Sequence, residues 1–156
     1  MTMKILQTSG PNDTTVNHLN SLLKGEISAT ETYRMAIDKA AGKETPEHTD
    51  LLQKFQEEHA ASASHLRQCI ADLGGEASDT SGAWAKTVQG TMNIFGAVSA
   101  LKAIREGEEH GLNDYEAAAA EVDTRSRQLI EEQLIPTIKN HLAALDRLID
   151  EAGKRK

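Results

Sequence analysis

Two glutamates occupy matching positions in the two halves of this 156-residue chain. Glu26 and Glu108 each follow a glycine, and each precedes a tyrosine, Tyr33 or Tyr115, by seven residues. Both glutamates fall inside apolar helical stripes, where an unpaired carboxylate costs several kcal/mol. Metal ions, histidines and hydroxyl groups are the usual partners of such carboxylates. The repeated pattern therefore predicts a buried polar or metal-binding site.

Apolar residues recur at three- and four-residue spacing along most of the chain, which predicts helices. We expect a flexible arm at residues 1–12 and one domain at residues 13–153, with helices at about 14–41, 46–73, 83–95, 98–121 and 124–152. Gly74 and Gly75 should end the second helix, and Pro136 should kink the last one. Two antiparallel hairpins joined by a long crossover that contains a short helix give the all-α fold of a ferritin-like four-helix bundle.

Polar residues on the inward stripes of the four long helices should meet at one level of this bundle. Counting outward from the two turns places one expected metal ligand on each helix: Glu26, His59, Glu108 and His141. His141 falls about one helical turn beyond Glu108, an offset that long side chains or the Pro136 kink would absorb. Carboxylate and imidazole ligands suit iron, manganese or zinc. The neighbours expected around these ligands are Tyr33, Tyr115, Thr30 and Ser62.

Three segments resemble helices of the bacterioferritins. They are Leu19-Asn20, Leu23, Glu26-Ile27, Ala29 and Tyr33 in the first helix, Glu108-Glu109-His110-Gly111 in the third long helix, and Asn140-His141-Leu142 with Leu145 in the last. The resemblance implies a ferritin-like fold in which Glu26, Glu108 and His141 stand at ligand positions and Tyr33 lies beside the metals. In overall style the chain is similar to small bacterial ferritin-like families of unknown function.

The chain departs from the di-iron pattern on two helices. A ferritin-like di-iron site uses Glu-x-x-His on the second and fourth helices, because three-residue spacing turns both ligands to one face. Here His59 and Ser62 occupy the two positions on the second helix, and Ile138 replaces the glutamate before His141. Two bridging carboxylates are missing, so ferroxidase activity is not expected.

Two functions of different classes stay open. In the first, the site holds one divalent metal ion, or a weak pair, and serves metal storage, metal handling or protection from oxidative stress. A shifted register that uses Glu58 and His65, which share a helical face, would restore part of the ligand set. In the second, the two glutamates pair with protonated histidines and no metal, and the chain is a structural or interaction protein.

Composition limits the partners. The formal net charge of −7 argues against a nucleic-acid binder, which needs a clustered basic surface. A secretory leader and a run of membrane-spanning length are both missing from the sequence, so we expect a cytoplasmic protein that does not bind membranes. Haem is not expected, because Met35 lies beside Arg34 and off the inward stripe. We expect a homo-oligomer, most simply a dimer.

Overall fold

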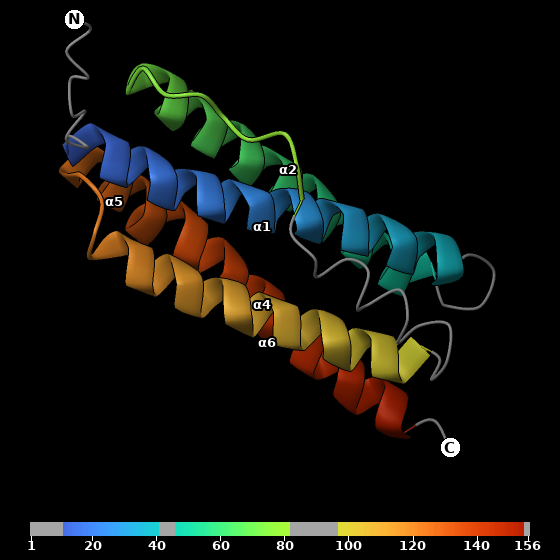
Figure 1. Cartoon of the computed structure of the whole chain (residues 1–156). Coiled ribbons are helices and arrows are strands. Elements are labelled where there is room, and N and C mark those ends of the chain that lie inside the picture. Colours follow the sequence, from blue (N-terminus) through green and yellow to red (C-terminus); the bar gives the residue numbers. More distant parts are fainter. Residues whose placement is uncertain (1–10, 41–45, 82–96, 155–156) are drawn as a thin grey trace, which may run out of the picture.

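The computed structural model describes residues 11–40, 46–81 and 97–154, and the regular structure within these ranges is entirely helical. Helix α1 covers Pro11–Ala40, α2 covers Pro46–Asp72 and α4 covers Ala97–Ala119. The last helix is continuous and consists of α5 (Thr124–Leu129), a π-helical turn η1 (Ile130–Leu134) and α6 (Ile135–Lys154). Helices α1 and α2 lie side by side as one hairpin, and α4 and α6 lie side by side as the other (Figure 1). The predicted all-α bundle is therefore present.

The described helix boundaries lie within two residues of the predicted ranges except at the start of α1. This helix begins at Pro11, three residues before the predicted start at residue 14, so residues 11 and 12 of the predicted arm are helical. Proline fits the first turn of a helix because the backbone N–H that it lacks has no partner there in any case. Residues 1–10 of the arm and the predicted crossover helix at 83–95 lie outside the described residues.

Two glycines end α2, as predicted. Gly74 has a φ of 75°, a left-handed conformation that glycine adopts without steric cost. The N–H of Gly74 donates to the carbonyl of Ala71 at 2.9 Å, and the N–H of Gly75 donates to the carbonyl of Ile70 at 2.9 Å. This pair of bonds is a Schellman motif, and it satisfies carbonyl groups that the end of a helix leaves free.

A layer of polar side chains divides the core of the bundle into two apolar clusters. The first cluster includes Leu19, Leu23, Leu66, Ile70, Ile130 and Leu134. The second cluster includes Tyr33, Leu52, Phe55, Ile104, Leu145 and Leu148. On every long helix the buried residues between the two clusters are polar, and they include Glu26, His59, Glu108 and His141. The helices pass from one cluster to the other through a single polar level.

The disturbance expected at Pro136 takes the form of a π-helical turn. Proline has no N–H to donate to the carbonyl of Glu132, and its ring crowds that carbonyl. Directly before it, the N–H of Ile135 donates to the carbonyl of Ile130, five residues back, and the turn accommodates the proline within a continuous helix.

A side-chain cap starts the last helix. The Asp123 carboxylate accepts a hydrogen bond from the N–H of Ser126 at 2.8 Å. Replacing Asp123 with alanine should lower the free energy of unfolding by about 1 kcal/mol, because that N–H loses its partner. Urea denaturation measures this loss. Asp123→Asn is the matched control, since asparagine caps equally well, and a similar loss in both variants would show that the cap is not the cause.

None of the helices in the described ranges combines the length and the apolar character that crossing a membrane requires.

Candidate metal centre

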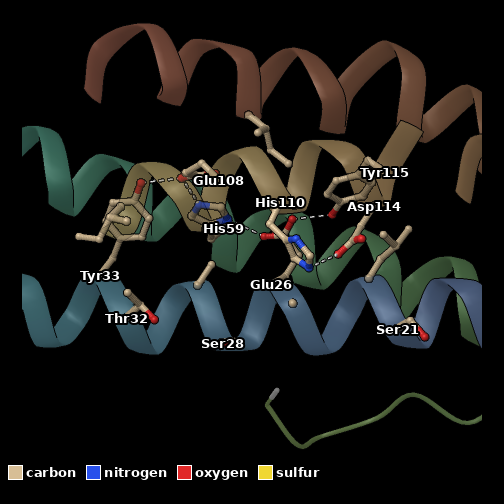
Figure 2. Close-up of a pocket in the computed structure, with 17 residues that line it drawn as sticks. Ser21, Glu26, Ser28, Thr32, Tyr33, His59, Glu108, His110, Asp114 and Tyr115 are labelled. Atoms are coloured by element: carbon tan, nitrogen blue, oxygen red, sulfur yellow. Dashed lines mark hydrogen bonds and ion pairs between the residues drawn. The ribbon is translucent and has the colours of Figure 1, made fainter. Parts of the chain in front are cut away.

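The four predicted ligands meet at the polar level of the bundle. Glu26 and Glu108 are each 4% exposed, His59 is 3% exposed and His141 is fully buried. The side chains of α1, α2 and α4 turn toward one another there (Figure 2). The structure thus brings together residues that are up to 115 positions apart in the sequence, between Glu26 and His141.

Glu26 bridges a tyrosine and a histidine. The hydroxyl of Tyr115 donates to Glu26 Oε1 at 2.5 Å. The other carboxylate oxygen, Oε2, lies 2.6 Å from Nδ1 of His59. Both oxygens of this buried carboxylate are therefore hydrogen-bonded, which compensates its removal from water.

Glu108 lies at the centre of the cluster. Its Oε1 accepts a hydrogen bond from the hydroxyl of Tyr33 at 2.5 Å and also lies 2.9 Å from His59 Nε2 and 3.0 Å from His141 Nδ1. One oxygen atom thus contacts side chains from three other helices, α1, α2 and α6. Glu108 is the side chain on which the polar level depends most.

Glu58 extends the cluster toward solvent. Its Oε2 lies 2.7 Å from Nε2 of His141, and its side chain is 37% exposed. The ring of His141 also lies against that of Phe55, with centroids 4.1 Å apart. A chain of contacts consequently runs from Tyr115, buried on α4, to the partly exposed Glu58 on α2.

The ionisation of the cluster follows from these contacts. Burial alone lowers the pKa of His59, but the carboxylates of Glu108 and Glu26 outweigh it and raise the pKa to about 10. Burial raises the pKa of Glu108, but His59 and His141 hold that pKa well below its ordinary value. In the metal-free protein at neutral pH, His59 is therefore an imidazolium that donates to Glu108 and Glu26.

The tyrosines remain neutral donors. Burial, reinforced by Glu108, raises the pKa of Tyr33 well above its ordinary value. Burial and the carboxylate of Glu26 likewise raise the pKa of Tyr115 well above its ordinary value. Each hydroxyl therefore stays protonated and donates a hydrogen bond to a glutamate.

The directions in which the two side chains point compensate for the predicted offset of about one helical turn between Glu108 and His141. Side chains of a helix tilt toward its N-terminus. Glu108 on α4 therefore points away from the turn that follows α4, and His141 points back toward the same turn. The two side chains converge from helix positions that differ by about one turn along the hairpin.

Other residues of the predicted site lie apart from the cluster. The hydroxyl of Thr30 donates to the backbone carbonyl of Glu26 at 2.9 Å and so contacts the helix rather than the carboxylate. Ser62 is buried, and within the described residues its hydroxyl makes no hydrogen bond to any of the four ligands. His65 is exposed, because it lies off the buried stripe of α2, so only Glu58 of the shifted register joins the cluster.

The contact of Phe55 with His141 was not predicted, nor was the pairing of Glu58 with that histidine in the unshifted register. Phe55, Glu58 and His59 follow one another at helical spacing on α2. That spacing was the available signal, since it places all three beside the same level of the bundle. It could not show that α6 lies close enough for both residues to contact His141.

Three residues of the cluster offer atoms to a metal ion. His59, Glu108 and His141 are buried, and one ligand atom from each lies within 4.8 Å of the others. Two imidazoles and one carboxylate form a ligand type that binds divalent iron in other proteins and also suits manganese and zinc. The residues present therefore fit one divalent ion.

Comparison with known proteins identifies the family. A family model described as a domain of unknown function, DUF2383, matches residues 14–121. The chain belongs to the DUF2383 family. The matched part of this DUF2383 chain contains Glu26, His59 and Glu108, while His141 lies on the helix beyond it. No match was found among curated proteins.

A solved structure agrees with the fold of this DUF2383 protein. It is described as a crystal structure of ferritin like, diiron-carboxylate proteins from Bacillus anthracis str. Ames. The TM-score is 0.74 at 20% sequence identity, over 91% of this chain and 99% of that one. The DUF2383 chain therefore has the ferritin-like fold that its sequence predicted.

Proposed function

We propose that this DUF2383 protein binds one divalent metal ion, iron, manganese or zinc, at the polar level of its bundle and serves in metal handling or stress protection. His59, Glu108 and His141 are the proposed ligands, with Glu26 as a further carboxylate. The observation that carries the proposal is the meeting of buried ligand atoms from His59, Glu108 and His141 within 4.8 Å of one another. The fold of the diiron-carboxylate relative supports it.

Charge favours a single divalent ion. With both histidines neutral, Glu26 and Glu108 supply two negative charges, which match the charge of one divalent cation. A bound ion would also have free coordination positions, where it could act as a Lewis acid or bind a small oxygen ligand. Glu58 holds His141 through Nε2, the type of outer contact that orients a metal-binding imidazole.

The helix positions that would supply the second half of a di-iron site do not favour a second ion. Ser62 and Ile138 are buried at 5% and 3% exposure, so both face the interior, but neither carries a carboxylate or an imidazole. A tightly held iron pair needs the missing carboxylates. We therefore propose a single-ion site without ferroxidase activity.

A second candidate function rests on a specific observation. In the metal-free protein both ring nitrogens of His59 and both of His141 face carboxylate oxygens, so the cluster is already hydrogen-bonded. On this account the polar level only fixes the register of the helices, and the protein acts through its surface. Hydrogen bonds through the histidines then take the place of metal coordination.

A thermal melt with and without metal separates the two functions. At a free Mn²⁺, Fe²⁺ or Zn²⁺ concentration one hundred times Kd, a binding site should add about 2.7 kcal/mol to stability. The double variant Glu26→Gln/Glu108→Gln should lose this metal-dependent gain. The matched control is Glu57→Gln/Glu106→Gln, which removes the same charge from exposed positions on α2 and α4.

The control variant should keep the full gain. If wild-type protein gains nothing from any of the three metals, while the Glu26/Glu108 variant is merely less stable, the metal proposal fails and the internal polar layer is the better account.

A further inference from the structure

A cleft between α1 and α4 leads from the surface to the polar level. Its volume is about 320 Å³. The exposed residues His110 and Asp114 line it together with the buried residues Glu26, His59 and Glu108 (Figure 2). The side chains of His110 and Asp114 are 74% and 60% exposed, and His110 Nε2 lies 3.8 Å from Asp114 Oδ2. The cleft therefore has an outer end and a floor, and the floor contains His59 and Glu108, two of the three proposed metal ligands.

Glycines border this cleft on both helices. Gly25 and Gly107 directly precede the two ligand glutamates, and Gly111 lies one turn after Gly107. Glycine in the middle of a helix is destabilising relative to alanine, so its presence calls for a reason. Close packing is not that reason at two of these positions. Among the residues that the structure describes, a Cβ added at Gly25 would meet nothing within 4 Å, and one at Gly111 would meet only Ile138 Cδ1 at 3.9 Å.

A buried hydroxyl in the cleft has no partner in the described part of the chain. Thr32 is 2% exposed and lines the cleft, and its Oγ1 makes no hydrogen bond with any described residue. Threonines in helices commonly donate to the carbonyl four residues earlier, as Thr30 and Thr137 do here at 2.9 Å. Thr32 does not, so its hydroxyl remains available to a group inside the cleft.

We propose that this cleft is the route by which a hydrated divalent cation reaches Glu26 and Glu108, an inference that rests on the proposed metal-binding function. Asp114 and the two glutamates place carboxylates at both ends of the route, although the charge of His59 partly offsets them at the floor. The protein as a whole has a formal net charge of −7. Hydroxyl and carboxylate oxygens are suitable partners for the waters of a hydrated ion. The glycines keep the route open, and Thr32 contacts the ion's water shell on the way.

The rate of Co²⁺ binding tests this route. Metal-free protein is mixed with Co²⁺ alone in a stopped-flow instrument, and the absorbance of the bound ion is followed. The variants Gly25→Leu and Gly111→Leu place a side chain at the cleft and leave every proposed ligand in the sequence. Gly153→Leu is the matched control, because it is also a helical glycine and no described atom lies within 4 Å of its added Cβ, but it lies outside the cleft.

We expect Co²⁺ association and dissociation to slow by about tenfold or more in both cleft variants, so that Kd changes by less than about twofold. Gly153→Leu should bind at the wild-type rate. Asp114→Asn, which leaves the cleft open, should slow association only, and the effect should shrink at high salt.

The outcomes distinguish the route from the site. If wild-type protein binds Co²⁺ and the cleft variants bind it at the same rate, the route is refuted and the metal site stands. If the cleft variants lose equilibrium affinity at unchanged association rate, the cleft is part of the binding site and the route is again refuted. If wild-type protein binds no Co²⁺, both proposals fail. Circular dichroism of each variant verifies that it is folded.

Discussion

Replacing Glu108 with alanine should lower the free energy of unfolding of the metal-free protein by about 3–5 kcal/mol, the range for removing one member of a buried charged network. The change removes the oxygen that contacts Tyr33, His59 and His141 at 2.5, 2.9 and 3.0 Å. The Tyr33 hydroxyl is then buried without its acceptor. The rings of His59 and His141, whose centroids are 4.8 Å apart, lose the negative charge between them.

Denaturant unfolding with circular dichroism measures this effect. Glu106→Ala is the control, because Glu106 is exposed on the same helix, and it should change stability by no more than about 0.5 kcal/mol. A loss below about 1 kcal/mol for Glu108→Ala would mean that the cluster relaxes or admits water, and that Glu108 is not its centre.

Metal-free protein should also lose stability as the pH rises from neutral toward 10. The pKa of His59 is raised from 6.5 to about 10 in the folded protein, because Glu108 and Glu26 outweigh the effect of burial. The stabilisation from this imidazolium is complete below pH 6.5 and is lost as the pH rises through the folded-state pKa. The slope in between is at most about 1.4 kcal/mol per pH unit.

On the acid side, the metal-free protein should instead lose stability as the pH falls. The pKa of Glu108 is lowered from 4.5, so its contribution is present above that value and is lost as the pH falls through the depressed pKa. These two groups together therefore give their largest stabilisation between about pH 4.5 and 6.5.

Urea midpoints of chelator-treated protein, measured between pH 7 and 9.5, test the basic limb. The matched variant His59→Gln should be less stable at pH 7 and should show a much flatter profile. An equal slope in both proteins would assign the pH dependence to other groups and would remove the case for a charged His59.

Much of the site could be predicted because its residues belong to regular helical stripes. Glu26 and Glu108 interrupt apolar stripes, and His59 lies at the same distance from the first turn as Glu26, so their convergence follows from helix geometry. The same reasoning placed Ser62 and Ile138 at inward positions, and both are buried. The end of α2 could also be predicted, because Gly74 readily adopts the left-handed conformation that ends this helix.

What could not be predicted depends on how helices approach one another. The contact between Glu58 and His141 requires a particular rotation of α2 relative to α6, which spacing along one helix does not determine. The space beside Gly25 could not be predicted for the same reason. The sequence shows a glycine before each glutamate, but it does not show that a Cβ at Gly25 would meet no described atom within 4 Å. Pro136 identified a disturbed helix, but it did not show that the disturbance takes the form of a π-helical turn at Ile130–Leu134.

The most direct measurement is an anomalous-scattering map from crystals of the protein grown with Mn²⁺ or Zn²⁺, with data collected on both sides of the metal's absorption edge. We predict one strong peak per chain, in the space bounded by His59 Nε2, Glu108 and His141 Nδ1, with Glu58 still contacting His141. A map without a peak at this level, or with the metal bound only at surface carboxylates, would refute the proposed metal site and leave the cluster as a hydrogen-bonded layer of the bundle.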